Sequence, residues 1–323
     1  MLKFRSLGSS LALGAAVLGV AGFASSRALA QSGQVYVSAQ NGNDAGSCTV
    51  VSPCRTVTYA MTQVQIFGQV LITDSGDYDS SVEIDKSVTI AAAPGVVAVF
   101  SAAMNLGTIF SVGAGPAFCT QQGVCHSLVL RGLTLDGQNV TQDAIRAGGM
   151  RLTVEDCYFS RFRFGIYMNG SGTLNIRRTT FREIDQGIYI APVGVRRTVT
   201  AVVEDSSFDA LRTNGINADT NGNNGLSLSV HRSRFVNAGV AIRSSASLGG
   251  WVQFNVEHSH VANSTTGVIS INGSSVVRVS NSTIVNNTTG VSAAIGGVLL
   301  TRGNNTVEGN NSNGTFTGGF AAQ

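Results

Sequence analysis

The amino-acid sequence predicts an all-β protein in which short strands coil repeatedly around one axis. Three observations lead to this prediction: a strand-and-corner motif recurs at intervals of 22 to 27 residues, its strands are short, and the chain contains 39 glycines. The repetition is plainest near the C-terminus, where residues 263–268 read N-S-T-T-G-V and residues 286–291 read N-N-T-T-G-V. A fixed period of this length is typical of solenoids.

Each repeat contains a large apolar residue that can be followed from coil to coil. This position is occupied by Leu135, Phe159, Phe181, Phe208, Phe235, Val261 and Ile284. Six or seven residues later comes Gly followed by Ile or Val, as in Gly165-Ile166, and Gly239-Val240 is the same pair two residues early. The strand at 152–154 and its equivalents alternate apolar with polar residues, which is a period of two. Such a small unit cannot bury its apolar face alone, so successive units must stack.

Aligned coils place equivalent residues one strand apart, and this predicts specific neighbours. Small residues precede the large apolar residue by two positions, so Cys157 is predicted to be a buried thiol in an inward corner. Three and four positions before it, acidic and basic residues mostly alternate between coils, which is favourable because opposite charges attract across strands. The column four positions before it is Arg131, Glu155, Arg177, Glu204, His231, Glu257 and Ser280. The column three positions before it is Gly132, Asp156, Arg178, Asp205, Arg232, His258 and Asn281.

The repeated N-S-T-T-G-V and N-N-T-T-G-V segments are predicted to form corners between strands. Asn237, Asn263 and Asn286 would stack their side-chain amides at one corner. The glycine of each Thr-Thr-Gly would supply backbone dihedral angles that other residues disfavour.

This pattern resembles the right-handed parallel β-helix of the pectin-lyase-like superfamily, over most of the chain after residue 30. The segment V-Y-V-S-A-Q-N-G-N-D-A-G at 35–46, with P-C-R-T-V at 53–57, is similar to the first segment of many such proteins. A helix from there to about Gln65, with Val57, Ala60, Met61 and Val64 on one face, is expected to cap the open end of the solenoid. The predicted organisation is a signal peptide at 1–30, an N-terminal cap at 31–69, coils at 70–302 and an irregular C-terminal cap or tail at 303–323.

The first thirty residues have the features of a secretory signal peptide: Lys3 and Arg5, an apolar run, and Ala28-Leu29-Ala30 as a cleavage site. We therefore expect an exported protein, in the periplasm, at the cell surface or outside the cell, with no membrane span after cleavage. The signal holds three basic residues and no acid, so the mature chain has 21 − 3 = 18 basic side chains against 18 acidic ones. This balance argues against a nucleic-acid partner.

Four of the five cysteines form two matching local pairs, Cys48 with Cys54 and Cys119 with Cys125. In an exported protein this spacing predicts two small disulfide loops. Loops this short would each stabilise the fold by roughly 2 kcal/mol on the chain-entropy model.

The candidate binding groove lies along the coils at residues 159–219. The alignment puts Arg163 beside Asp185 and Arg212, and Arg161 beside Glu183, while Tyr167 and Tyr189 share one outward position. The tyrosine rings could pack on the apolar face of an acidic sugar while Arg161 and Arg163 pair with its carboxylate. The weak catalytic candidates are Arg163, Asp185 and Arg212. The competing interpretation is another alternating charge ladder, with tyrosines that cover the sheet.

No metal site is predicted. Residues 219–225 resemble half of a calcium loop, but Asn224 stands where that loop needs Gly and Val230 where it needs Glu, so calcium is unsupported. His258 and His260 have no third ligand in the alignment. No other cofactor is expected.

Enzymes of the pectin-lyase-like superfamily cleave or epimerise polysaccharides with side chains exposed on one parallel sheet. The Asn-Thr-Asp, paired-Asp, His-Gly and Arg-Ile-Lys motifs of polygalacturonase-like members are absent from this sequence. The resemblance therefore favours a carbohydrate-associated protein that binds a polysaccharide, and leaves lyase or hydrolase activity undecided. The alternative is a non-catalytic surface or structural solenoid that contacts proteins.

Overall fold

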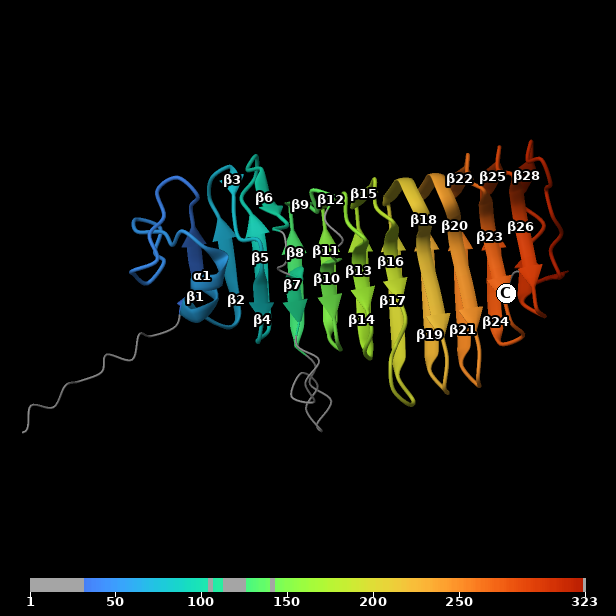
Figure 1. Cartoon of the computed structure of the whole chain (residues 1–323), viewed down its shortest axis with the longest axis horizontal. Coiled ribbons are helices and arrows are strands. Elements are labelled where there is room, and N and C mark those ends of the chain that lie inside the picture. Colours follow the sequence, from blue (N-terminus) through green and yellow to red (C-terminus); the bar gives the residue numbers. More distant parts are fainter. Residues whose placement is uncertain (1–31, 104–106, 113–125, 140–142, 322–323) are drawn as a thin grey trace, which may run out of the picture. The chain divides into compact units, whose positions relative to one another are not determined.

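The computed structural model describes residues 32–103, 107–112, 126–139 and 143–321. The predicted signal peptide at 1–30 and the Cys119–Cys125 pair lie outside these residues. The described chain is a right-handed parallel β-helix of about 8 turns, as predicted. Figure 1 shows the strands following one another along the stack in sequence order.

Each complete coil passes through three strand positions, and strands at the same position in successive coils pair in parallel. The first column forms one sheet of β1 (Ser32–Val37), β2 (Val64–Ile72), β5 (Val88–Ala92), β8 (Ser127–Arg131), β11 (Arg151–Glu155), β14 (Gly172–Arg177), β17 (Thr198–Glu204), β19 (Gly225–His231), β21 (Trp251–Glu257), β24 (Ser275–Ser280), β27 (Val298–Thr301) and β29 (Gly318–Gly319).

The other sheet holds the second and third columns, which β18 (Ser207–Thr220) and β20 (Arg234–Ala246) join because each runs through both. The second column also contains β3 (Gly76–Asp77), β6 (Ala98–Ser101), β9 (Leu133–Asp136), β12 (Tyr158–Ser160), β15 (Thr180–Arg182), β22 (His260–Ala262), β25 (Thr283–Val285) and β28 (Thr306–Glu308). The third column also contains β4 (Val82–Ile84), β7 (Thr108–Val112), β10 (Asp143–Ala147), β13 (Phe164–Met168), β16 (Gln186–Ile190), β23 (Thr266–Ile271) and β26 (Thr289–Ala294).

The predicted large apolar position forms the centre of the core. The rings of Phe159, Phe181, Phe208 and Phe235 are fully buried and stack in this order, with centroid separations of 4.8, 4.8 and 4.5 Å. These separations match the spacing of neighbouring strands. One stacked column of rings therefore ties four coils together.

The glycine that follows the large apolar residue packs closely against the next coil. A Cβ atom added to Gly165 would lie 2.6 Å from the Gly187 carbonyl oxygen and 2.8 Å from Cδ1 of Phe181. The prediction that the glycine of Thr-Thr-Gly supplies dihedral angles that other residues disfavour was wrong, because neither Gly267 nor Gly290 has a positive φ. The left-handed backbone instead belongs to the corner asparagines themselves, with φ of 54° at Asn263 and 57° at Asn286. Asparagine tolerates this conformation better than most residues.

The amide ladder lies one residue beyond those corner asparagines. The Asn287 side chain accepts a hydrogen bond from the Ser264 N–H (2.9 Å) and donates one to Oδ1 of Asn310 (2.9 Å). The predicted stack of Asn237, Asn263 and Asn286 is thus displaced by one position, because these residues turn the backbone at an exposed corner.

The coil that follows Phe235 has the usual length, which corrects the alignment of Gly239-Val240. Val240 pairs with Asn214 and Ile242 with Ile216, so Ala241-Ile242 is the true counterpart of Gly215-Ile216. Alanine occupies the glycine position there, and a search for glycine finds the wrong pair.

The charge columns have the predicted register. Glu155 pairs with Arg131 and Arg177 in the sheet. At a left-handed corner Arg178 forms an ion pair with Asp156, and Arg232 forms one with Asp205.

Cys157 lies in the inward corner, 3% exposed, with Sγ 3.2 Å from the Glu155 carbonyl oxygen. Burial raises the pKa of its thiol to about 12, so this thiol is inert at neutral pH.

The two ends of the coil stack differ. At the N-terminal end the helix α1 (Val57–Gln63) buries Val57, Ala60 and Met61 against the first strands, and Figure 1 shows it beside β1 and β2. At the C-terminal end, β28 and β29 continue the strand pairing into the segment predicted to be irregular. α1 is the one helix among the described residues and is too short to be a candidate membrane span.

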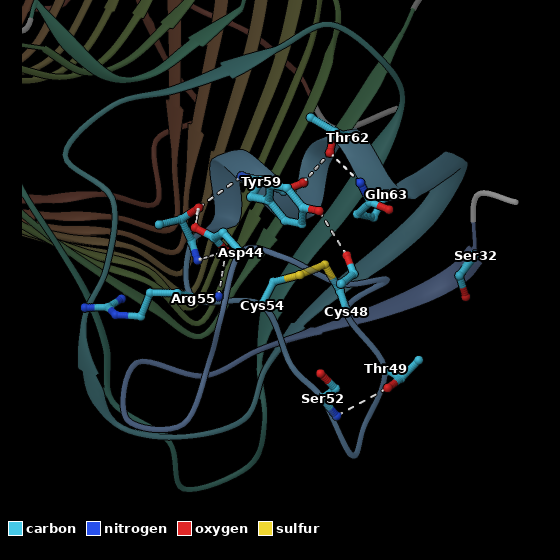
Figure 2. Close-up of a disulfide and its surroundings, with 12 residues drawn as sticks. Ser32, Asp44, Cys48, Thr49, Ser52, Cys54, Arg55, Tyr59, Thr62 and Gln63 are labelled. Atoms are coloured by element: carbon cyan, nitrogen blue, oxygen red, sulfur yellow. Dashed lines mark hydrogen bonds between the residues drawn. A yellow bond between two sulfur atoms is a disulfide. The ribbon is translucent and has the colours of Figure 1, made fainter. Parts of the chain in front are cut away.

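The Cys48–Cys54 disulfide forms as predicted, with Cα atoms 4.7 Å apart. Figure 2 shows it next to Tyr59 of α1, whose hydroxyl donates a hydrogen bond to the Gly46 carbonyl oxygen (3.1 Å). The Asp44 carboxylate accepts hydrogen bonds from the N–H groups of Arg55 and Thr56. The disulfide loop is therefore joined to the helix that covers the first coils.

Candidate functional site

The outward side of the third strand column carries the predicted tyrosines within a longer row. Arg146 of β10 pairs with Tyr167 of β13, then Tyr189 of β16, Asn217 of β18 and Arg243 of β20 follow at the same register. Each step is one strand spacing, about 4.8 Å. The row therefore presents two aromatic rings between two guanidinium groups.

The two tyrosine rings form a stacked platform. Their centroids are 5.1 Å apart and their planes differ by 10°. Phe164, at the start of β13, packs against both, 5.4 Å from Tyr167 and 5.3 Å from Tyr189. Burial, the Asp219 carboxylate and Tyr167 raise the pKa of Tyr189, so its hydroxyl stays protonated and can donate hydrogen bonds. An aromatic surface of this kind can receive an apolar ligand face.

Two arginines at the β10 end of this platform share one buried carboxylate. Nη2 of Arg163 is 2.8 Å from Oδ1 of Asp143, and Nε of Arg146 is 3.4 Å from Oδ2. Each guanidinium also lies over a ring, Arg163 at 4.6 Å from the Phe164 centroid and Arg146 at 5.2 Å from that of Tyr167. Cation–π contacts and the shared carboxylate hold both groups in place.

The buried position of Asp143 sets the charge of this cluster. Burial raises the pKa of the Asp143 carboxyl, and the hydrogen bond from Arg163 and the charge of Arg146 oppose that shift. The Asp143 side chain is 2% exposed, whereas the side chains of Arg146 and Arg163 are 47% and 42% exposed. With Asp143 ionised, the cluster presents a net charge of +1 to solvent through two guanidinium groups.

The structure brings the other predicted charged residues close to this platform but distributes them among different partners. Asp185 accepts a hydrogen bond from Nη1 of Arg212 (3.1 Å), while Arg163 turns to Asp143. A polar hollow of about 30 Å³ is lined by Arg161, Arg163, Asp185 and Arg212, among others. The hollow lies at the N-terminal ends of β13 and β16, next to Phe164.

Arg161 is held by the preceding coil. Its guanidinium forms an ion pair with Asp136, which raises its pKa. Glu183, its aligned neighbour, is 3.3 Å from Nε of Arg182. Arg161 therefore lies at the margin of the aromatic platform with its charge already matched.

A larger groove opens at the C-terminal ends of the same strands. It has a volume of about 280 Å³ and is lined by Tyr167, Tyr189, residues 191–193, residues 219–221 and Ser247. Asp219 contributes a carboxylate that is 36% exposed and 3.5 Å from Nη1 of Arg243. The same nitrogen donates a hydrogen bond to Oδ1 of Asn217 (2.8 Å). This end of the platform is polar, with matched charges.

The two candidate metal motifs have structural explanations. Asn224, within the calcium-like segment, accepts a hydrogen bond from the Arg197 N–H (2.8 Å) and donates to the carbonyl oxygens of Pro192 and Gly194. His258 lies at a charged corner, 3.8 Å from Glu257. In the part of the chain that the structure describes, no three His, Cys, Asp or Glu side chains converge as metal ligands.

Sequence reasoning missed Asp143, Arg146 and Phe164 at one end and Asp219 and Arg243 at the other. Ala144-Ile145 aligns with Gly165-Ile166, so Asp143 and Arg146 belong to a coil whose glycine is replaced by alanine. A search for apolar pairs rather than for glycine would have placed them in the row. The outward position of Arg243 follows in the same way from Ala241-Ile242.

Comparison with known proteins supports the fold. A family model for a right-handed β-helix region matches residues 122–265. A rhamnogalacturonan lyase is 13% identical, with a TM-score of 0.55 over 78% of this chain and 76% of that one. The pectate lyase Pel9A is 14% identical, with a TM-score of 0.60 over 91% of this chain and 80% of that one. No curated protein matches the sequence.

At these identities the structural likeness shows the fold alone. The chain is a right-handed parallel β-helix protein with structural neighbours in the pectate lyase-like superfamily. What it binds must be argued from its own side chains.

Proposed function

We propose that this protein binds an acidic polysaccharide across the stacked rings of Tyr167 and Tyr189. The observation that carries the proposal is the pair of guanidinium groups of Arg146 and Arg163, held beside those rings by the single buried carboxylate of Asp143. The apolar C–H face of a sugar ring packs on an aromatic face. The exposed N–H groups of the two arginines can then donate to the sugar carboxylate.

The same geometry favours binding over cleavage. A guanidinium that is paired with a carboxylate stays protonated, so Arg146 and Arg163 act as hydrogen-bond donors and are poor general bases. Asp143 and Asp185 accept hydrogen bonds from arginines, which opposes a role as free base or nucleophile. The fold neighbours named above are a rhamnogalacturonan lyase and a pectate lyase, which supports the carbohydrate class. We propose that binding needs neither calcium nor another cofactor.

We also propose that the protein works outside the cytoplasm. The Cys48–Cys54 disulfide supports this, because such bonds persist in oxidising compartments. The signal-like composition of residues 1–30 also supports export from the cytoplasm.

The test uses the mature chain from Gln31 and a panel of neutral and acidic polysaccharides, with calcium and with a chelator. Affinity is measured by calorimetry, and new reducing or unsaturated ends are measured in parallel. We expect binding of acidic polymers without new ends. Tyr167→Ala combined with Tyr189→Ala should weaken binding by about tenfold or more.

The matched control is Tyr158→Ala, because Tyr158 is exposed on β12, in the same coil as Tyr167 but in a different strand column. Unchanged binding by the double variant would contradict the assignment of the binding site to Tyr167 and Tyr189. New chain ends would make the protein an enzyme, and Arg163, Asp185 and Arg212 would be substituted next. The absence of binding to every polymer would favour the alternative of a structural solenoid that contacts proteins.

A further inference from the structure

We propose that the two ends of the tyrosine platform select different sugars, so that the preferred polymer links a carboxylate-bearing sugar to a neutral one. The inference rests on the proposed function and names the class of polysaccharide. Its basis is the difference in charge between the Asp143 cluster and the Asp219 groove.

The Asp143 end is the carboxylate subsite. Arg146 and Arg163 share one buried acid, so their outward N–H groups face solvent with an excess positive charge. A ligand carboxylate placed there gains hydrogen bonds from donors that are already held over Phe164 and Tyr167. These donors lose little side-chain entropy on binding, since ring and carboxylate contacts fix them beforehand.

The Asp219 end is unsuited to a second carboxylate. The cation that contacts the Asp219 carboxylate, Arg243, also donates a hydrogen bond to Asn217. A ligand carboxylate in this groove would be repelled by the partly exposed Asp219 carboxylate, and the charge of Arg243 is already matched by that carboxylate. Hydroxyl groups suit it better, because the Asp219 carboxylate accepts hydrogen bonds and Asn221 and Ser247 offer donors and acceptors.

The spacing of the two ends fits an oligosaccharide that runs along the coil stack. The coil of Arg146 and the coil of Asn217 are three strand steps apart, and the two tyrosines occupy the steps between them. Three steps of about 4.8 Å give roughly 14 Å. A polymer lying across these strands therefore reaches the carboxylate subsite and the Asp219 groove at once.

The experiment compares polygalacturonate, in which every sugar carries a carboxyl group, with two alternating acidic–neutral polymers, rhamnogalacturonan backbone and hyaluronan. Oligosaccharides of matched length are titrated into the mature chain at low salt. We expect at least one alternating polymer to bind about tenfold more tightly than polygalacturonate.

The variant Asp219→Asn should strengthen polygalacturonate binding by roughly fivefold, since it removes the repulsion and leaves Arg243 with an unmatched charge. Binding of the preferred alternating polymer should change less. The matched control is Asp209→Asn, on the same strand β18 but in the second column, where the Asn237 amide donates to Oδ1. It should leave all affinities unchanged.

Equal or tighter binding of polygalacturonate by the unmodified protein, with no gain on Asp219→Asn, would overturn this inference and leave the proposed function standing. Binding of none of the acidic polymers would overturn both. A fivefold gain with Asp209→Asn as well would show a general charge effect and would also overturn it.

Discussion

Arg163 and Asp143 form an ion pair between neighbouring coils in which the carboxylate is buried and the guanidinium is half-exposed, with Nη2 2.8 Å from Oδ1. Arg163→Met would leave a buried charge with only the more distant Arg146. We expect a loss of about 2–3 kcal/mol in the free energy of unfolding, measured by urea denaturation.

The double-mutant cycle with Asp143→Asn distinguishes this pair from general packing. When Asp143→Asn has removed the buried charge, Arg163→Met should reduce the free energy of unfolding by much less. If Arg163→Met reduced the free energy of unfolding equally with Asp143 and with Asn at position 143, Asp143 and Arg163 would not be coupled.

Gly165 packs against the next coil so closely that a methyl group has no room. Gly165→Ala should reduce the free energy of unfolding by about 1–3 kcal/mol, because either the Phe181 ring or the coil spacing must shift. Gly46→Ala is the control, since its nearest neighbour would be 3.6 Å away. Thermal denaturation compares the two variants, and equal melting temperatures would contradict the steric argument.

The charged corners make stability depend on pH. Hydrogen bonds from Arg178 and Arg232 lower the pKa values of Asp156 and Asp205 below their ordinary value of 3.8. These two carboxylates then bind protons more readily in the unfolded chain than in the folded protein. The stabilisation by their ion pairs is therefore complete above about pH 4 and is lost as the pH falls through the lower pKa values of the folded protein. Combining Asp156→Asn with Asp205→Asn should flatten the acid limb of the stability curve measured by urea denaturation. An unchanged acid limb would refute the role of these pairs.

Cys157 is protected by its inward corner. Because its pKa is raised to about 12, a thiol reagent should fail to modify it at pH 8 in the native protein and should modify it after unfolding. Peptide mapping by mass spectrometry reports this residue separately from other cysteines. Rapid native labelling would mean that the corner opens.

Much of the fold could be predicted because a solenoid repeats its constraints. Seven aligned apolar positions, the small inward residues and the alternating charges all indicated one register, and Glu155 lies between Arg131 and Arg177 as expected. The errors in coil alignment share one cause. Glycine was taken as the marker of a coil, whereas alanine replaces it at positions 144 and 241, so the residues next to these alanines were placed in no coil or in the wrong register.

The candidate site could be predicted only in part. The stacking of Tyr167 and Tyr189 follows from their equal positions in neighbouring coils. The ion-pair partner of Arg163 does not follow from the alignment of the coils, because Asp143 and Asp185 lie on either side of it in the stack. Which of them Arg163 contacts depends on side-chain conformation and burial.

The sequence by itself determined the coil period, the strand columns, the Cys48–Cys54 disulfide and the paired tyrosines, since each follows from spacing along the chain. Only the tertiary structure decided which carboxylate each arginine contacts and that Asp143 is buried while Asp219 is partly exposed in a groove. The physical reason is that strand register fixes which residues are neighbours. Burial and charge pairing depend on side chains and loops from several coils at once.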